Sequence, residues 1–329
     1  MAPELYIGLL SGTSIDCVDA ALVDCSNNQA RLLETHSEPI ADELKVRIIE
    51  LCNPGANEID RLGSLDRRLG FMFARAANGL LKKARLKPAT ITAIGSHGQT
   101  VRHRPAGRGR SVDDAFTLQI GDPNTIAENC AITTVADFRR RDIAANGQGA
   151  PLVPVFHRAA FSAPGTARAI INIGGMSNVS LIALDGSVLG FDTGPGNVLL
   201  DSWIKVHKGQ DYDAGGSWAA SGQILEPLLN AMLAHPFLAQ DIPRSTGRED
   251  FNLEWLLRLV EQHETRPPVD VQATLLEYTA RTICAALARY SRPPYEAYVC
   301  GGGAYNTLLM QRLQALLQPN PVATTAALG

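Results

Sequence analysis

The sequence lacks several features that would place it in common classes of protein. Its six cysteines form no Cys-x-x-Cys pair and no Cys/His cluster with metal-ligand spacing, so we expect reduced thiols in the cytoplasm rather than a disulfide framework. No apolar run is long enough to span a membrane, and no basic, apolar leader opens the chain. The pattern Gly-x-x-x-x-Gly-Lys-Ser/Thr is absent, which argues against a P-loop NTPase.

A strong charge of either sign is also absent. The formal net charge of −3 over 329 residues gives no electrostatic case for nucleic acid or an anionic membrane as a partner. What is present, 45% hydrophobic and 19% charged residues, is typical of a globular α/β protein with a large core. At this length, two ordinary domains are more typical than one.

Two related glycine-rich turns stand in separate halves of the chain. The stretch Ala169–Ile182 predicts an apolar strand, a turn at Gly174 and Gly175, and a second apolar strand. The stretch Leu5–Val23 repeats this pattern with a turn of Gly, Ser and Thr. Glycine lets the backbone approach a ligand, and exposed N–H groups in such a turn can cradle phosphate. The pair predicts an internal duplication, with two lobes that grip one nucleoside triphosphate.

A third glycine turn follows a predicted strand at 297–300. Gly301, Gly302 and Gly303 stand between this strand and a helix predicted over 307–317. Bare backbone accepts a flat base or ribose, and a helix N-terminus favours phosphate. Alone, such a turn is more often structural. In the company of the two hairpins it favours nucleoside binding.

Helices and strands alternate along both halves. An apolar helix face is predicted from Ile59 to Leu81 by spacings of three and four residues, and residues 102–114, rich in Arg and Gly, predict a loop. Further strands are predicted at 91–95, 116–120, 132–135 and 188–191. Further helices are predicted at 125–130, 198–204, 224–233, 253–260 and 271–289.

Several polar residues follow predicted strands, where open α/β sheets bind their ligands. They are His97, Asp122, Asp137 and Arg139. Asp122 or Asn124 is also a candidate cap for the helix at 125–130. A histidine in such a place is a structural hydrogen-bonding group about as often as a functional one.

These motifs resemble the anhydro-N-acetylmuramic acid kinase family. The segments that carry the resemblance are Gly8–Asp19, Ser96–Thr100, Ala136–Arg139, Asn172–Asn178, Phe191–Asn197 and Ser245–Glu249. They span essentially the whole chain in the family's order, and Asp-Thr-Gly-Pro-Gly-Asn at 192–197 is particularly specific. The resemblance implies an α/β fold of two ribonuclease-H-like lobes of the actin and hexokinase type. It implies lobes at 1–160 and 161–329, with an ATP cleft between them.

The resemblance also implies an activity. An ATP- and magnesium-dependent enzyme would hydrolyse the 1,6-anhydro bridge of 1,6-anhydro-N-acetylmuramic acid and phosphorylate O6, giving N-acetylmuramic acid 6-phosphate in peptidoglycan recycling. A cytoplasmic homodimer is implied as well. Asp192 takes the role of general base for water, and one carboxylate suffices because the γ-phosphoryl group of ATP accepts O6. A lone Asp before a glycine turn is at least as often a cap.

The remaining site residues follow from the same resemblance. Those expected to bind ATP are Gly12, Thr13, Ser14, Ile15, Asp16, Cys17, Val18, Asp19, Gly174, Gly175, Gly301, Gly302 and Gly303. Those expected to bind the sugar are His97, Gln99, Asp122, Asp137, Arg139, Gly194 and Asn197. Asp16 or Asp19 would hold Mg²⁺ through water. Arg139 suits the lactyl carboxylate through a bidentate fork.

Two features depart from the family pattern. Cys17 stands where the family has glycine, and a Cβ there would cost on the order of 1 kcal/mol if the site needs positive φ. The family also implies a helix after Gly329, which this sequence lacks. Two alternatives stay open: another actin-like amino-sugar kinase, such as one for N-acetylglucosamine, and a non-catalytic nucleotide- or sugar-binding homologue. The intact Asp192 favours the enzyme.

Overall fold

The structure is a computed structural model that describes residues 4–12, 15–26, 30–107, 109–248, 250–263 and 267–328. It divides the chain into two compact units, Met1–Gly149 and Ala150–Gly329. The division falls earlier than the lobe boundary expected after residue 160. Helix α5 (Val153–Phe161) packs on β8 (Met176–Ile182) and β9 (Val188–Pro195), so it belongs to the second unit.

The first unit contains a sheet in the order β3-β2-β1-β4-β5. Its first three strands form an antiparallel meander: β1 (Leu5–Ser11), β2 (Cys17–Asp24) and β3 (Arg31–Pro39). The long strand β4 (Ile91–Arg104) lies parallel to β1. It pairs with β6 (Thr134–Val135) in parallel and, further along, with β5 (Phe116–Ile120) in antiparallel fashion.

The second unit repeats this topology. Its sheet has the order β11-β10-β7-β8-β9, in which β7 (Arg168–Ile173), β8 and β9 form the meander. Strand β10 (Glu296–Cys300) is parallel to β7, and β11 (Val322–Thr324) is parallel to β10. Three antiparallel strands followed by strands parallel to the first are the arrangement of a ribonuclease-H-like lobe. The expected fold class and internal duplication are therefore confirmed.

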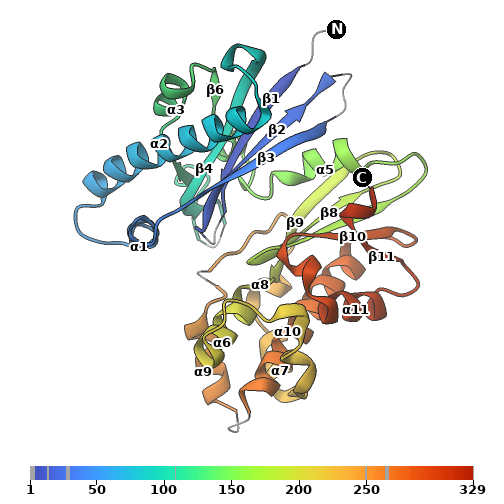
Figure 1. The fold of residues 1–329 in the computed structure, drawn as a ribbon. Coiled ribbons are helices and arrows are strands. Elements are labelled where there is room, and N and C mark those ends of the chain that lie inside the picture. The colour runs from blue at the N-terminus through green and yellow to red at the C-terminus, as the bar shows by residue number, and fades with distance from the viewer. Residues whose placement is uncertain are drawn as a thin grey trace. The chain divides into compact units, whose positions relative to one another are not determined.

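Helices cover both sheets (Figure 1). In the first unit α2 (Glu58–Ala84) packs along the sheet, with α1 (Asp42–Leu51), α3 (Pro123–Cys130) and α4 (Phe138–Ala144) beside it. The apolar face predicted for α2 is buried from Leu65 to Leu81, whereas Ile59 in its first turn is 85% exposed. The predicted face is therefore correct except at the start of the helix.

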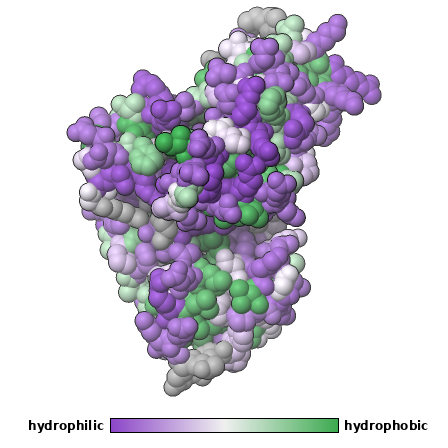
Figure 2. Space-filling model, turned by 90° about the vertical axis from the view of Figure 1, so that its left-hand side faces the viewer, coloured by the Kyte–Doolittle hydropathy of each residue, from purple (hydrophilic) through white to green (hydrophobic). Residues whose placement is uncertain are grey.

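The second unit is richer in helices. They are α5, α6 (Val198–Lys208), α7 (Glu226–Leu233), α8 (Pro236–Ala239), α9 (Leu253–Glu261), α10 (Pro268–Tyr290) and α11 (Thr307–Leu316). The helices predicted at α6, α7, α9, α10 and α11 are confirmed to within a few residues. On the face in Figure 2, hydrophilic residues predominate and hydrophobic ones form separate patches.

Two predicted boundaries were wrong. The loop expected over 102–114 begins later, because β4 continues to Arg104 and the Arg102 guanidinium is fixed by the carbonyls of Leu51 and Cys52 and by Glu58. Strand β9 was expected to end at residue 191, but its pairing with β8 continues to Pro195. Asp192 therefore lies within a strand. The sequence-based predictions also did not include β3, α1, α4, α5, α8 or β11.

A buried carboxylate ties α10 to α11. Glu277 on α10 is 1% exposed, and its oxygens accept hydrogen bonds from Arg312 Nε (2.6 Å), Arg312 Nη2 (2.7 Å) and Arg281 Nε (2.6 Å). Burial alone would raise the pKa of Glu277, but the hydrogen bonds from Arg312 and Arg281 outweigh it, so the pKa lies below its usual value.

We expect Glu277→Gln to lower the free energy of unfolding by about 2 kcal/mol at pH 7, less than the usual cost of breaking a buried pair because both arginines are partly exposed. A carboxylate with a depressed folded-state pKa stabilises the protein above its unfolded-state pKa, and this contribution is lost as pH falls through the folded-state value. The difference from the parent, measured by urea unfolding, should therefore shrink in acid. Glu254→Gln, in an exposed pair with Arg258, is the matched control and should change stability little.

Candidate functional site

The second unit brings its three glycine segments together at one edge of its sheet. Strands β7 and β10 are parallel, and β9 runs in the same direction because both β7 and β9 are antiparallel to β8. Their carboxyl ends lead into Gly174-Gly175, Gly301–Gly303 and Gly196-Asn197 respectively. This is the edge at which α/β sheets bind ligands.

The start of α6 is bonded directly to the β7–β8 turn. Gly196 N–H and Val198 N–H donate to the carbonyl of Gly175 (2.9 and 3.1 Å), and Asn197 N–H donates to the carbonyl of Gly174 (2.8 Å). A Cβ at Gly196 would lie 2.3 Å from the Gly174 carbonyl oxygen. Only glycine permits this approach.

The third segment meets the end of β7. Gly301 has φ +81°, and a Cβ there would lie 2.6 Å from Asn172 Oδ1 and 2.7 Å from the Ile173 carbonyl oxygen. An added Cβ at Gly302 would lie 3.4 Å from Asn197 Nδ2. The structure therefore brings Gly174, Gly175, Asn197 and Gly301–Gly303 into one group, as a shared site requires.

Asp192 lies on β9 beside this group, and it is 6% exposed. Its Oδ2 accepts a hydrogen bond from Thr246 N–H (2.9 Å), and its backbone exchanges hydrogen bonds with Arg244: Asp192 N–H to the Arg244 carbonyl (3.2 Å) and Arg244 Nε to the Asp192 carbonyl (3.0 Å). The N-cap of α6 is Asn197, and the alternative interpretation of Asp192 as a cap of the next helix or turn stays open.

Arg244 holds Asp192 in place and was missed by the sequence analysis. Its buried guanidinium also donates to the carbonyls of Leu238 and Gln240 (both 3.1 Å). The rings of Phe191, Phe237 and Tyr290 surround it, with centroids 5.0–5.9 Å from its central carbon. Thr246 could have been found, since it lies in one of the family-like motifs, whereas Arg244 stands in no motif.

In the first unit the end of β1 is pinned to β4. Ser11 Oγ donates to Gln99 Oε1 at 2.6 Å, both side chains being buried, and Gln99 Nε2 donates to the Thr100 carbonyl. Of the predicted phosphate-binding residues after it, Thr13 and Ser14 lie outside the described residues. Gly12 is exposed, and its carbonyl accepts a hydrogen bond from Ile15 N–H.

The backbone strain expected at Cys17 is absent. Cys17 opens β2 in extended conformation, paired with Pro39, whereas Ile15 has φ +59°. The left-handed region is unusual for a β-branched residue, so the strain in this turn falls two residues earlier than expected. Burial and the hydrogen bond to Asp19 raise the pKa of the Cys17 thiol to about 11.

The two candidate magnesium residues both have protein partners. Asp16 forms an ion pair with Lys45, and Asp19 Oδ1 accepts hydrogen bonds from Ser37 Oγ (2.6 Å) and Cys17 Sγ (3.3 Å). Both aspartates are exposed. Across the described ranges, no three His, Cys, Asp or Glu side chains gather in a way that could hold a metal ion.

His97 and Arg139 meet, as expected for parts of one site. Arg139 Nε donates to His97 Nε2 at 2.7 Å, and Arg139 Nη1 donates to the Gly149 carbonyl at 2.7 Å. Burial and the Arg139 charge lower the pKa of His97 to about 4, so the ring is neutral at pH 7. Its Nδ1–H then faces the Gly98 carbonyl at 2.9 Å. The guanidinium is thereby held in a fixed orientation.

Asp122 and Asp137 have different local roles. Asp122 is the N-cap of α3: its carboxylate accepts hydrogen bonds from Asn124 N–H (3.0 Å) and Thr125 N–H (3.1 Å), which confirms its capping role. Asp137 is exposed, has φ +64° and pairs with Arg140 at 3.4 Å. The expected contact of either residue with the sugar stays a prediction.

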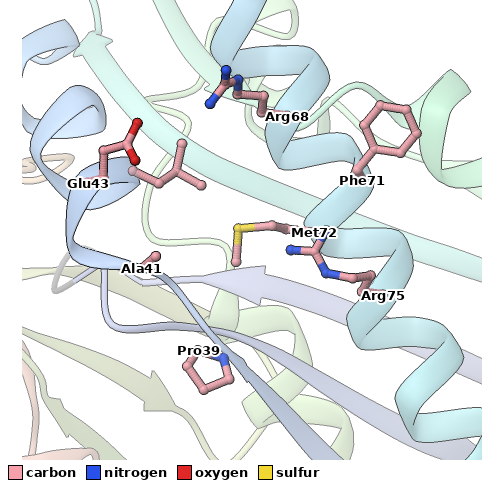
Figure 3. A pocket seen from close by; sticks show the side chains of 8 residues that line it. Pro39, Ala41, Glu43, Arg68, Phe71, Met72 and Arg75 are labelled. Atoms are coloured by element: carbon pink, nitrogen blue, oxygen red, sulfur yellow. The ribbon is translucent and has the colours of Figure 1, made fainter.

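Each unit has one surface pocket that the structure defines by its lining residues. One, of about 440 Å³, lies between α1, which contributes Glu43, and α2, which contributes Arg68, Phe71 and Arg75 (Figure 3). None of the residues lining it is a predicted site residue. The second, of about 350 Å³, is lined by Leu238, Arg244 and Thr282, among others. Leu238 and Thr282 are also the neighbours that a Cβ at Gly194 would meet, so this hollow adjoins the strand of Asp192.

Comparison with known proteins decides the family. A model described as anhydro-N-acetylmuramic acid kinase matches residues 4–329. The chain belongs to the anhydro-N-acetylmuramic acid kinase family. Among relatives of that name, the protein of Saccharophagus degradans is 48% identical and that of Shewanella sp. strain W3-18-1 is 51% identical. Each alignment covers 100% of this chain and 88% of the relative.

Similar solved structures are more distant. The activator of 2-hydroxyisocaproyl-CoA dehydratase from Clostridium difficile with bound ADPNP matches with a TM-score of 0.46 and 14% identity. The match covers 98% of this chain and 87% of that chain. In the part of this kinase-family chain that the structure describes, no helix is both long and apolar enough to cross a membrane.

The contact between Gly196 and the β7–β8 turn predicts a loss of ATP affinity in Gly196→Ala. The added methyl group must displace the Gly174 carbonyl and with it the turn, so we expect ATP to bind at least about tenfold more weakly, a cost of roughly 1.4 kcal/mol. Isothermal titration of ATP measures this. Gly63→Ala is the control, because Gly63 lies inside α2 with open space at its Cβ. Unchanged ATP affinity in Gly196→Ala would contradict the role of the turn.

Proposed function

We propose that this chain uses ATP to phosphorylate O6 of 1,6-anhydro-N-acetylmuramic acid while water opens the anhydro bridge. The product is N-acetylmuramic acid 6-phosphate, an intermediate of peptidoglycan recycling. One observation carries the proposal: in a chain of this kinase family, a buried carboxylate, Asp192, is fixed beside the gathered glycine segments. A base held next to the nucleotide is what a reaction with both water and ATP needs.

The bonds change as follows. The water oxygen forms a bond to C1 of the sugar, and Asp192 takes one proton from this water. The bond between C1 and O6 breaks, and its electron pair stays on O6. O6 bonds to the γ-phosphorus of ATP, and the bond from that phosphorus to the β–γ bridging oxygen breaks, which releases ADP. Asp192 thus acts as a general base and the phosphoryl group as the acceptor for O6.

The orientation of the carboxylate supports this role. Thr246 N–H fixes Oδ2, and the reciprocal hydrogen bonds with Arg244 fix the backbone on which the carboxylate stands. A general base must hold its geometry before the reaction, because misplacement by an ångström costs rate. We infer that Arg244 positions Asp192 and does not itself contact the substrate.

The proposal assigns a role to residues of each unit separately. In the second unit the first N–H groups of α6 donate to the carbonyls of Gly174 and Gly175, and the Gly174 N–H donates to the Met176 carbonyl (3.2 Å). The proposal therefore assigns the phosphate contact of this turn to the Gly175 N–H, and Gly301–Gly303 accommodate the nucleoside. In the first unit residues 12–19 bind the transferring phosphoryl group. His97 and Arg139 hold the sugar, with the Arg139 guanidinium facing the lactyl carboxylate.

The residues present fit a Mg²⁺ ion that has few protein ligands. Exposed Asp16 and Asp19 offer one or two carboxylates, and Mg²⁺ bound with ATP typically takes few protein ligands beside phosphate oxygens and water. When bound, the ion would neutralise charge on the phosphates. A homodimer and a cytoplasmic location are part of the same proposal, supported by the family resemblance, and six free thiols agree with that location.

The test is ADP release with ATP and Mg²⁺, offered 1,6-anhydro-N-acetylmuramic acid or N-acetylglucosamine. We expect turnover with the anhydro sugar alone, and a loss of about 10³-fold or more in Asp192→Asn, the usual range for a general base and above. Turnover with N-acetylglucosamine instead would favour the other amino-sugar kinase. ATP binding without turnover of either sugar would favour the non-catalytic homologue.

A further inference from the structure

The pocket that adjoins the strand of Asp192, which we call the Arg244 pocket, has two arginines in its wall. Its volume of about 350 Å³ is at the low end of the roughly 300–1,000 Å³ in which proteins bind small ligands. Among the described residues that line it, the polar and charged ones are His235, Arg244, Thr282 and Arg289, and none is acidic. The other lining residues are apolar: Leu233, Ala234, Leu238, Ala239, Ala285 and Ala286. This lining suits a ligand that combines a negative charge with an apolar part.

Helix α10 provides one wall of the Arg244 pocket. Thr282, Ala285, Ala286 and Arg289 follow one another at spacings of three and four residues, so they share one face of this helix. The two alanines in the middle of this face carry nothing beyond Cβ, which leaves space beside the helix. Further lining residues come from the end of α7 and from α8. The apolar part of a ligand can therefore lie against α10, with a cation at one end of the face.

The guanidinium of Arg244 is buried without a carboxylate partner. Arg244 is 5% exposed, and its Nε and Nη1 donate to the backbone carbonyls of Asp192, Leu238 and Gln240. Among the described residues, no carboxylate forms an ion pair with it and no group accepts a hydrogen bond from Nη2. Its immediate partners are thus neutral carbonyls and aromatic rings, whereas buried cations in proteins are ordinarily paired with an anion.

A ligand in the pocket can reach Nη2 of Arg244. This nitrogen is not one of the fully enclosed polar atoms that lack a partner, and Arg244 lines the pocket. Burial lowers the pKa of Arg244 below its usual value, and the neighbouring charge of Arg289 lowers it further. An anion bound in the pocket would oppose both effects, because it favours the charged form of the guanidinium.

Arg289 brings a second positive charge to the same pocket. The Gln240 carbonyl accepts hydrogen bonds from Arg244 Nη1 (3.1 Å) and from Arg289 Nη1 (3.5 Å), so the two guanidinium groups are close neighbours. Arg289 Nη2 pairs with Asp241, an exposed residue that does not line the pocket. A carboxylate has two acceptor oxygens and can therefore accept hydrogen bonds from both arginines at once.

We propose that the Arg244 pocket binds a small organic carboxylate with an apolar chain. The carboxylate accepts hydrogen bonds from Arg244 Nη2 and from Arg289, and the chain lies against the alanine face of α10. An anion without an apolar chain would leave that face uncovered. Because Arg244 Nε also holds the backbone of Asp192, the bound carboxylate stabilises the contact between the Arg244 loop and β9. Binding at this pocket does not require the proposed reaction.

Hexanoate is the probe, titrated calorimetrically into the full chain. Acetate has the charge without the chain, and 1-hexanol has the chain without the charge. We expect hexanoate to bind at least about tenfold more tightly than either of them. Saturating hexanoate should also slow hydrogen exchange at the Asp192 and Thr246 amides, because both donate hydrogen bonds in the contact that the ligand stabilises.

Two pairs of variants locate the ligand. Arg289→Gln removes one cation and should weaken hexanoate binding at least about tenfold, the loss of a charge-assisted hydrogen bond. Arg258→Gln, in an exposed ion pair with Glu254, is its control. Ala285→Glu places a carboxylate in the pocket, and Ala285→Gln places a neutral group of the same size there. Ala285 is exposed on α10 and both new side chains favour a helix, so we expect both variants to fold.

Support requires weaker binding in Arg289→Gln than in Arg258→Gln, and binding at least about tenfold weaker in Ala285→Glu than in Ala285→Gln. Hexanoate that does not bind saturably, or that binds equally to all four variants, overturns the proposal. Binding that is lost in Arg139→Gln instead places the carboxylate at the predicted sugar site and also overturns it. ADP release without hexanoate tests the proposed function separately, so either proposal can fail while the other stands.

Discussion

The site in the second unit depends on a close approach between two stretches of backbone. The N–H groups of residues 196–198 donate to the carbonyls of Gly174 and Gly175, over a gap that leaves no room for a Cβ at Gly196. This contact joins the end of β9 to the end of β7, and the contact of Gly301 with β7 adds β10. These contacts bring three separate glycine segments together into one surface. They also fix the positions of the residues at the ends of the three strands.

The proposed base, Asp192, is held in place by hydrogen bonds from a neighbouring loop. Asp192 stands directly before a bulge in β9, after which the pairing with β8 continues to Pro195, and the loop that carries Arg244 and Thr246 is hydrogen-bonded to it. Backbone hydrogen bonds in both directions and one to the carboxylate leave it little freedom. In the first unit, the Ser11–Gln99 and His97–Arg139 pairs fix side chains in the same way. The predicted site is therefore built largely before any substrate arrives.

Much of this could be predicted from the sequence, and the failures have physical causes. Glycine turns between apolar runs gave both hairpins, because local chemistry dictates them. Strand β3 was missed because its pattern is polar and largely exposed, and β11 because three residues carry little periodicity. The positive φ falls at Ile15 rather than at Cys17. Which residue of the turn adopts it depends on the backbone path of the turn, and the sequence does not show that path. Arg244 was missed because its importance lies in hydrogen bonds to backbone that is distant in sequence, which no motif records.

The central claim is that Asp192 activates water rather than attacking the sugar itself. The most direct test is to determine by NMR the configuration at C1 of the product as it is first released. The spectra must be recorded before the α and β anomers interconvert. The anhydro bridge occupies the β face of C1, so a single attack by water from the opposite side predicts that N-acetylmuramic acid 6-phosphate appears first as the α anomer. Initial release of the β anomer would indicate a covalent intermediate on the carboxylate and would contradict the account.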